Sequence, residues 1–380
     1  MKVTIAIDSF KGSLSTFQAG NAVAEGVKLA DPEAETAVCP LADGGEGTVD
    51  AIIAATGGEM VKVTVCGPLG TPVKSSYDFI PQTKTAIIEM SAAAGITLVE
   101  EGDRNPLNTT TYGVGELIAD AIKKGCRKFI VGIGGSATND GGVGMLQALG
   151  FRFLDKAGNQ VALGGKGLAD IREIKIDGAM KELQDCAFCV ACDVKNPLCG
   201  ENGCSAIYGP QKGATPEMIR DMDAWLGRFA ALTKEVLPGS DANIPGTGAA
   251  GGLGFAFLAY LNATLQSGID LVMEATGLEE HIKDAEIVVT GEGRLDGQSY
   301  MGKAPVGVAE LAKKYGKTVI AFSGCVTEDA ALCNAHGIDA FFPIVPAPCT
   351  LQEAMDCDNA YKNLKNTACQ VFRLVKAVDQ

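Results

Sequence analysis

The chain has 380 residues, of which 47% are hydrophobic and 21% are charged, and it contains 48 glycines. This composition is that of a folded globular protein with a large core, and the length predicts about two or three domains. The formal net charge is −14. Because no stretch concentrates basic residues, the sequence argues against nucleic acid as a partner.

The N-terminal sequence "MKVTIAIDSF" has too short an apolar run for a signal peptide, and the longest apolar stretch, residues 249–261, is too short and too rich in glycine to cross a bilayer. We therefore expect a cytoplasmic protein with no membrane partner. Its 13 cysteines are expected to be free thiols. The run "CAFCVAC" at residues 186–192 leaves a metal site open, but its spacing favours a buried strand, in which successive thiols face opposite ways.

The N-terminal region alternates strands and helices. Residues 2–7 are predicted to form a strand, and Ser15 with Gln18 fits a capping box at the start of a helix that runs to about Leu29. The segment "TAVCPLA" predicts a second strand, and "TVDAIIAAT" predicts a second helix. This order is typical of a parallel sheet that is covered on both faces.

The middle of the chain has a different character. "VKVTVCGPLGTPVKSSYDFI" and "KTAIIEMSA" predict strands joined by short turns, and hence an antiparallel or mixed sheet. Helical spacing from Val114 to Ile122 then precedes the strand "KFIVGI" and a glycine-rich loop. The strand "FCVACDV", the helix "TPEMIRDMDAWLGRFAALTKEVL" and a glycine-opened helix at 248–261 follow.

From about residue 285 the alternation of strands and helices returns, and the last helix has one apolar face (Leu364, Ala368, Val371, Phe372 and Val375). We therefore predict an α/β protein with two domains. Residues 1–66 and 285–380 form a doubly wound parallel-sheet domain. Residues 67–284 are inserted as a second, mixed-sheet α/β domain.

Polar residues follow five of the predicted strands. In parallel sheets, ligands bind beyond the carboxyl ends of the strands, so these loops are the candidate site. Each combines a carboxylate with glycine, serine or a basic residue, although a plain turn explains any one of them alone. The loops are Asp8-Ser9-Phe10-Lys11, Asp43 to Gly47, Gly134 to Asp140, Asp193 to Asn196, and Gly291 to Asp296.

The glycine-rich loop leaves three interpretations open: a dinucleotide-binding loop, a cradle for phosphates, or a tight turn without chemistry. "GIGGSA", residues 132–137, matches the G-x-G-x-x-A pattern of dinucleotide-binding proteins, and Asp155 lies at about the right distance to bind a ribose. That pattern predicts an NAD(P)-dependent dehydrogenase of a small hydroxy acid. However, the loop continues as "TNDGGVG", which is longer than a tight dinucleotide turn and places Asn139 and Asp140 where close packing is needed.

The recurring combination of carboxylates, bare backbone and isolated cations suits phosphoryl transfer. The chain has 2 histidines, both outside these loops, so histidine acid–base chemistry is not expected. "GQSYMGKA", at 297–304, departs from a phosphate loop because Ala304 replaces the serine or threonine that binds Mg²⁺. Lys303 lies near a predicted helix start, where an anion is favoured. A non-catalytic binding protein for organic acids is the third alternative.

Taken in order, the loops resemble those of the bacterial glycerate kinase family, and the resemblance extends over nearly the whole chain. The family's usual proline before the first aspartate is Ile7 here. The motifs that carry the resemblance are "DSFKGSLS", "ADGGEGT", "GIGGSATNDGG", "ACDVKNPL", "GPQKGA", "GAAGGLG" and "TGEGRLDGQS" followed by "GK" and a proline.

The resemblance implies ATP-dependent phosphorylation of D-glycerate, generally to 2-phosphoglycerate, with Mg²⁺ as cofactor. It also implies a flavodoxin-like domain, a second mixed α/β domain and a site in the cleft between them. D-glycerate and ATP are the expected partners, and a homodimer is one open assembly state.

The same resemblance carries roles onto individual residues. Asp193, as base or metal ligand, Asp8 and Lys11 are expected to be catalytic. ATP is expected to contact Gly134, Gly135, Ser136, Asn139, Asp140 and Lys303. The substrate is expected to contact Ser9, Asp43, Lys212, Glu292, Arg294 and Asp296. The other possibility for each acidic residue is a structural acceptor for turn N–H groups.

Overall fold

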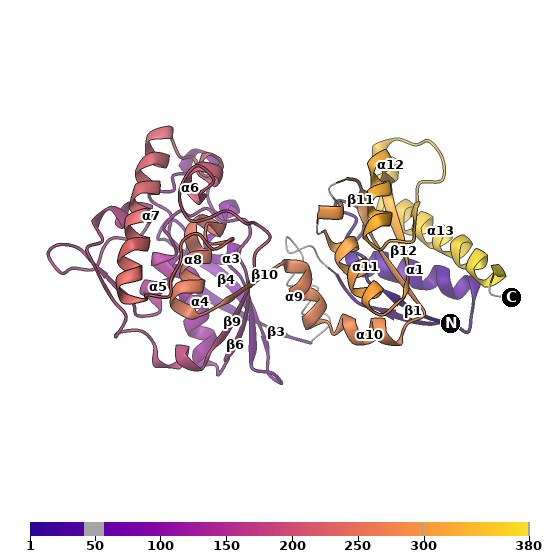
Figure 1. The fold of residues 1–380 in the computed structure, drawn as a ribbon, viewed down its shortest axis with the longest axis horizontal. Coiled ribbons are helices and arrows are strands. Elements are labelled where there is room, and N and C mark those ends of the chain that lie inside the picture. Colours follow the sequence, from indigo (N-terminus) through magenta and orange to yellow (C-terminus); the bar gives the residue numbers. More distant parts are fainter. Residues whose placement is uncertain (42–56, 298, 302, 379–380) are drawn as a thin grey trace. The chain divides into compact units, whose positions relative to one another are not determined.

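The structure is a computed structural model that describes residues 1–41, 57–297, 299–301 and 303–378 (Figure 1). The predicted helix "TVDAIIAAT" and the predicted substrate residue Asp43 lie outside these ranges. The chain groups into two compact units. Unit 1 comprises Met1–Thr56 and Gly268–Gln380, and unit 2 comprises Gly57–Ser267.

Unit 1 contains a five-stranded sheet in the order β13-β12-β11-β1-β2, and every strand pairing in it is parallel. The chain progresses from β1 to β2 on one side and from β11 to β13 on the other, so the direction of the crossovers changes between β1 and β11. This is the flavodoxin-type order. The strands are β1 (Lys2–Ile5), β2 (Glu35–Val38), β11 (Ile287–Leu295), β12 (Thr318–Val326) and β13 (Ala340–Pro343).

Helices cover both faces of this sheet. On one face, α1 (Thr16–Ala30) and α13 (Cys357–Val378) lie side by side (Figure 1). They approach closely at Gly26, where a Cβ would lie 2.4 Å from a backbone oxygen of α13. The predicted capping box is present, because Ser15 and Gln18 each accept the other's backbone N–H. The predicted apolar face of α13 joins the core through Leu364, Ala368, Val371 and Phe372.

The opposite face of the sheet is contacted by α10 (Leu278–Asp284) and α11 (Ala304–Lys314), and α9 (Gly268–Ala275) packs against both of these helices. After β12 the chain forms a 3₁₀ helix, η7 (Glu328–His336). A further short helix, α12 (Leu351–Met355), directly precedes α13.

Unit 2 contains a six-stranded sheet in the order β10-β9-β6-β5-β4-β3. The pairings from β10 to β5 are parallel and those from β5 to β3 are antiparallel, so the predicted mixed sheet is confirmed. The strands are β3 (Glu59–Cys66), β4 (Pro72–Ile80), β5 (Thr85–Glu89), β6 (Lys128–Gly132), β9 (Ala187–Ala191) and β10 (Thr264–Gln266).

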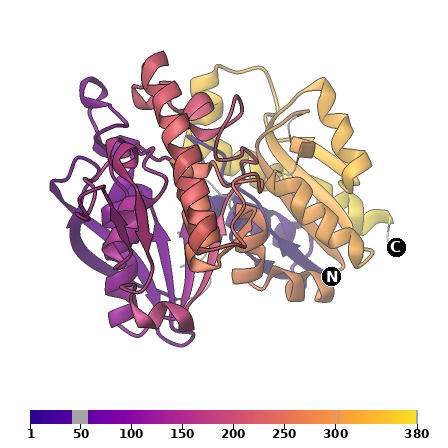
Figure 2. The ribbon, with the colours of Figure 1, turned by 60° about the vertical axis from the view of Figure 1, so that its left-hand side comes forward.

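On this sheet, α4 packs against β3, β4 and β5, and α8 packs against β9 and β10 (Figures 1 and 2). Aromatic side chains form part of the core of unit 2. The predicted glycine-opened helix has an irregular start, because residues 250–252 adopt left-handed φ values before the regular turns of α8 begin. A small hairpin pairs β7 (Arg152–Leu154) with β8 (Glu173–Lys175). The main helices are α4 (Tyr112–Lys123), α5 (Val143–Ala148), α7 (Pro216–Val236) and α8 (Ala249–Leu261).

The predicted fold class is confirmed, with a flavodoxin-like parallel sheet and a separate mixed α/β sheet. The predicted domain boundaries at residues 66 and 284 stay a prediction. The compact units differ from these boundaries in two places. The first division falls before β3, which belongs to unit 2 because it pairs with β4. The second falls before α9, so that α9 and α10 belong to unit 1, where they pack against α11. None of the helices in the described ranges combines the length and apolarity needed to cross a bilayer.

Candidate active site

A cavity of about 810 Å³ opens in unit 1 at the carboxyl ends of β1, β11 and β12. This is where ligands bind in a flavodoxin-type sheet, beside the change of crossover direction. Three segments that are far apart in the sequence meet here: the loop after β1, the end of β11 with the loop that follows it, and the residues from β13 to α12. Seven of the predicted site residues line the cavity, namely Asp8, Ser9, Lys11, Glu292, Arg294, Asp296 and Lys303.

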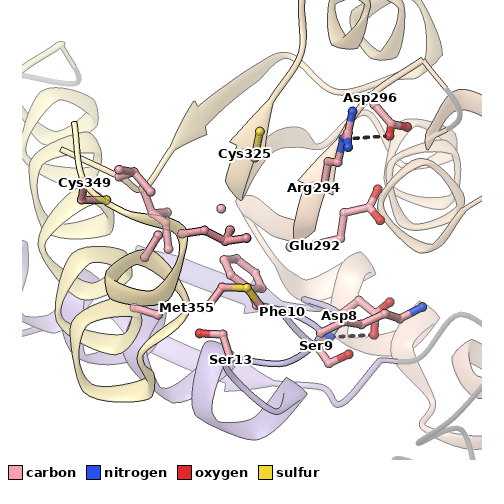
Figure 3. A pocket seen from close by; sticks show the side chains of 18 of the residues that line it. Asp8, Ser9, Phe10, Ser13, Glu292, Arg294, Asp296, Cys325, Cys349 and Met355 are labelled. Atoms are coloured by element: carbon pink, nitrogen blue, oxygen red, sulfur yellow. Dashed lines mark hydrogen bonds and ion pairs between the residues drawn. The ribbon is translucent and has the colours of Figure 1, made fainter. Parts of the chain in front are cut away.

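One side of the cavity carries alternating charges (Figure 3). Lys303 Nζ lies 3.8 Å from Glu292 Oε2 and 3.7 Å from Asp296 Oδ1. Arg294 Nε lies 3.3 Å from Asp296 Oδ2. Ser299 Oγ donates a 2.6 Å hydrogen bond to Glu292 Oε1. Because alternate residues of a strand face the same way, β11 presents Glu292 and Arg294 together at its end.

The loop after β1 brings Asp8 into the same cavity. Its backbone N–H donates to the Gly291 carbonyl oxygen at 2.9 Å, which fixes the loop to β11. Its carboxylate accepts the Ser9 backbone N–H at 2.6 Å, and the residue is only 5% exposed. The loop packs on Gly293, where a Cβ would lie 3.3 Å from the Phe10 Cα atom. A Cβ at this position would therefore crowd the backbone of the loop.

The other side of the cavity is apolar and was not predicted from the sequence. It is formed by Phe10, by residues 344–349 after β13 and by α12, and Figure 3 shows Met355 and Cys349 there, away from the charged side chains. Leu351 and Met355 are 76% and 39% exposed. The sequence did carry a signal, because "IVPAPC" follows a parallel strand as the other candidate loops do, but it contains no charged residue.

Unit 2 carries the glycine-rich loop, which follows β6 as predicted. Gly134 and Gly135 are exposed, and Gly135 has a φ of +69°, a value that glycine adopts readily. In the part of the chain that the structure describes, the backbone N–H groups of 134–136 donate no hydrogen bond within the protein. Free amides in such a loop are suited to binding an anion.

Lys212, a predicted substrate residue, lies beneath this loop and is 2% exposed. Its Nζ donates to Ser136 Oγ at 2.7 Å and to the Thr138 carbonyl oxygen at 2.6 Å. It therefore holds the loop in shape and adds positive potential behind the free amides. Burial lowers the pKa of Lys212 to about 8, against the opposing effects of Cys204 and Asp140.

The lowered pKa of Lys212 predicts a pH-dependent stability. Below pH 8 the folded and unfolded chains both hold the proton, so the full cost of burying the ammonium is present. Between pH 8 and 10.5 only the unfolded chain holds it, so this cost falls as the pH rises. Denaturant unfolding should show the stability of the unmodified protein rising by about 3 kcal/mol relative to K212M over this range. If the free energies of unfolding of the unmodified protein and K212M changed in parallel with pH, the prediction would be wrong. The exposed Lys234→Met is the control, and its free energy of unfolding should follow that of the unmodified protein at every pH.

Asp140 and Asn139, predicted to contact ATP, are fully buried in the same loop. Asp140 accepts the Thr111 backbone N–H at 2.8 Å, the Thr111 hydroxyl at 2.9 Å and the Gly142 N–H at 3.1 Å. Burial raises its pKa, which these hydrogen bonds oppose. Asn139 Nδ2 donates to Ser205 Oγ at 2.9 Å. The contacts of Asp140 support the structural alternative for this residue, and the hydrogen bond of Asn139 to Ser205 holds the same loop.

Asp193 follows β9 and is exposed. Because Gly132 of β6 and Ala191 of β9 are register partners in adjacent parallel strands, Asp193 and the Gly134–Ser136 loop lie at the same edge of the unit 2 sheet. The glycine-rich loop after β6 and Asp193 after β9, both predicted site residues, therefore lie at the same end of neighbouring strands. The structure does not change the prediction that the Asp193 carboxylate is a base.

Arg104 is a candidate that sequence reasoning missed. Its backbone lies against Gly213, next to Lys212, because a Cβ on Gly213 would come within 2.1 Å of the Arg104 carbonyl oxygen. Its Nε is buried without a hydrogen-bond partner in the described ranges. Burying an unpaired donor of a cationic side chain is costly, so such a group is expected to meet an anion. No motif of the sequence pointed to this residue.

Two alternatives from the sequence find no support in the structure. The turn after β6 is not a tight dinucleotide turn, because residues 133–142 separate the strand from α5. Asp155, the expected ribose ligand, instead closes a turn by accepting the N–H groups of Ala157 and Asn159. The cysteines are free thiols, and the described residues contain no group of three or more His, Cys, Asp or Glu side chains placed to hold a metal ion.

These features define an α/β enzyme that binds anionic substrates. They are the parallel sheet, the charged cavity at its carboxyl ends, and the loop of free backbone amides. The model of the glycerate kinase family matches residues 3–376, and the chain belongs to this family.

Several relatives that match over nearly their whole length support this assignment. The glycerate 2-kinase of Escherichia coli K12 is 48% identical over 99% of this chain and 97% of its own. The glycerate kinase of Bacillus subtilis 168 is 45% identical over 99% of this chain and 98% of its own. A crystal structure from Salmonella typhimurium LT2, of a protein assigned as glycerate kinase 2, matches with a TM-score of 0.91 and 47% identity. It covers 100% of this chain and 99% of its own.

Proposed function

We propose that the protein transfers a phosphoryl group from ATP to D-glycerate and forms 2-phosphoglycerate. The observation that carries this proposal is the meeting of predicted loop residues from separate parts of the chain around the charged cavity of unit 1. The full-length relatives support it, and the E. coli relative is named as a 2-kinase. No observation favours the dehydrogenase.

The reaction needs a group that accepts the proton of the glycerate hydroxyl as its oxygen attacks the terminal phosphorus atom of ATP, with ADP leaving. We assign this role to Asp193, whose carboxylate is exposed at the edge of the unit 2 sheet. Lys11, Arg294 and Lys303 would offset the charge of anionic groups in the unit 1 cavity. Gly134, Gly135 and Ser136 would bind phosphate oxygens through their free amides.

The residues present also fit Mg²⁺. This ion is usually held by one or two carboxylates together with substrate phosphates, rather than by a cage of protein ligands. A single exposed carboxylate at Asp193, or Asp8 in the unit 1 cavity, meets that need. Bound Mg²⁺ would neutralise charge on the triphosphate. The cytoplasmic location stays a prediction.

A direct test combines purified protein with D-glycerate, Mg²⁺ and ATP, and then with NAD or NADP in place of ATP. We expect ADP formation that requires all three components and no change in nicotinamide absorbance. ³¹P NMR then identifies the product, because the phosphorus of 2-phosphoglycerate couples to a single carbon-bound proton and that of 3-phosphoglycerate couples to a pair. ADP release no greater than that of a blank would refute the kinase assignment.

A further inference from the structure

The unit 1 cavity joins a charged wall to an apolar wall, and D-glycerate can use only the first of these. Glu292, Arg294 and Asp296 form the charged wall, and Phe10 with Met355 belongs to the apolar one (Figure 3). D-glycerate carries a polar group on every carbon atom, so it has no apolar face to cover the second wall. Pockets for small molecules and cofactors measure roughly 300–1,000 Å³, and the cavity, at about 810 Å³, lies in the upper part of this range.

The apolar wall also offers backbone hydrogen-bonding groups. The segment Val-Pro-Ala-Pro-Cys, residues 345–349, alternates proline with residues whose N–H groups make no hydrogen bond in the described chain. Proline fixes its own φ and favours an extended conformation in the residue before it, so this segment is stiff. A flat heteroaromatic ring has apolar faces and a polar edge. It can cover the exposed Leu351 and Met355 while its edge pairs with this backbone.

From these observations we infer that the apolar wall of the unit 1 cavity, residues 344–355 with Phe10, is the binding site for the adenine base of ATP and ADP. The phosphates then point to the charged wall, where Lys11, Arg294 and Lys303 lie. This assignment rests on the proposed use of ATP. It adds a site for the base, which neither the loops singled out in the sequence nor the relatives' names supply.

The first test fills the apolar wall. Ala354 of α12 lines the cavity and is only partly buried, so Ala354→Trp adds bulk there without disturbing the core. We expect the Kd for ADP, measured by titration calorimetry, and the KM for ATP to rise about ten-fold or more. The KM for D-glycerate should change less than about two-fold. Ala331→Trp, at an exposed position of η7 outside the cavity, should leave all three constants unchanged.

The second test uses the unmodified protein. Cys325 and Cys349 both line the cavity and are exposed. Saturating ADP should slow their alkylation about five-fold or more, as followed by peptide mass spectrometry, because a bound base shields them. The same concentration of inorganic pyrophosphate should protect them less. Cys186, before β9 in unit 2, should react at the same rate throughout.

The outcomes separate this inference from the proposed function. If Ala354→Trp binds ADP as tightly as the unmodified protein, or if ADP leaves both thiols fully reactive while ATP-dependent turnover persists, the base is not bound here and only the inference fails. If the unmodified protein neither binds ADP nor uses ATP, the proposed function fails and the inference fails with it.

Discussion

Replacement of Asp193 by asparagine is expected to lower kcat by about 10²- to 10⁴-fold, the usual contribution of a positioned general base. Asparagine has nearly the same shape but cannot accept the hydroxyl proton of glycerate. Asp193 is exposed, so the folded structure and the melting temperature should not change. Steady-state assays with ATP and D-glycerate, combined with a thermal unfolding curve, measure both quantities.

The chain provides a matched control at the opposite end of the same strand, β9. Asp185 is also an exposed aspartate, but it precedes β9, whereas Asp193 follows it. A parallel sheet places its ligands at the carboxyl ends of the strands, so Asp185→Asn should leave kcat within about two-fold of the unmodified protein. Equal rates for Asp193→Asn and the unmodified enzyme would remove Asp193 from the mechanism. Equal losses in both variants would indicate a general effect of charge.

The unit 1 site could be anticipated from the sequence because its physical basis is local. Short apolar runs alternate with amphipathic segments, which defines parallel strands, and the polar residues directly after a strand must then gather at one edge of the sheet. Asp8 follows β1, and Glu292 to Asp296 end β11, so their meeting in one cavity follows from the pairing of these strands. The capping box at Ser15 is local in the same way.

Burial could not be anticipated, because it depends on packing between distant segments. The motif "GPQKGA" predicts that Lys212 is a cation that contacts substrate. In the structure the Gly134–Asp140 loop covers this lysine. Asp140 follows an exposed glycine pair but is surrounded by Thr110 and Thr111, which lie about 30 residues earlier. The apolar wall of the unit 1 cavity was missed for the opposite reason, since apolar residues near a strand are ordinarily assigned to the core.

Replacement of Asp8 by asparagine is expected to lower kcat by about 10²-fold or more. Asp8 lies at the end of β1 in the unit 1 cavity, is almost fully buried, and accepts the Ser9 backbone N–H. Asparagine can keep that hydrogen bond through its own oxygen, so the loop should keep its shape while the negative charge is lost. Asp284→Asn, an exposed position paired with Lys2 in the same unit, is the control and should leave kcat unchanged.

ADP binding distinguishes the two ways in which this charge could act. If the Asp8 carboxylate helps to hold Mg²⁺ beside the phosphates, Mg²⁺ should tighten ADP binding to the unmodified protein but much less to Asp8→Asn. If the carboxylate merely faces the phosphates, its removal relieves repulsion between like charges, and Asp8→Asn should bind ADP more tightly without Mg²⁺ and keep its kcat. We expect the first result because a buried negative charge beside an anionic substrate would otherwise only weaken binding. The second result would exclude Asp8 from the catalytic machinery.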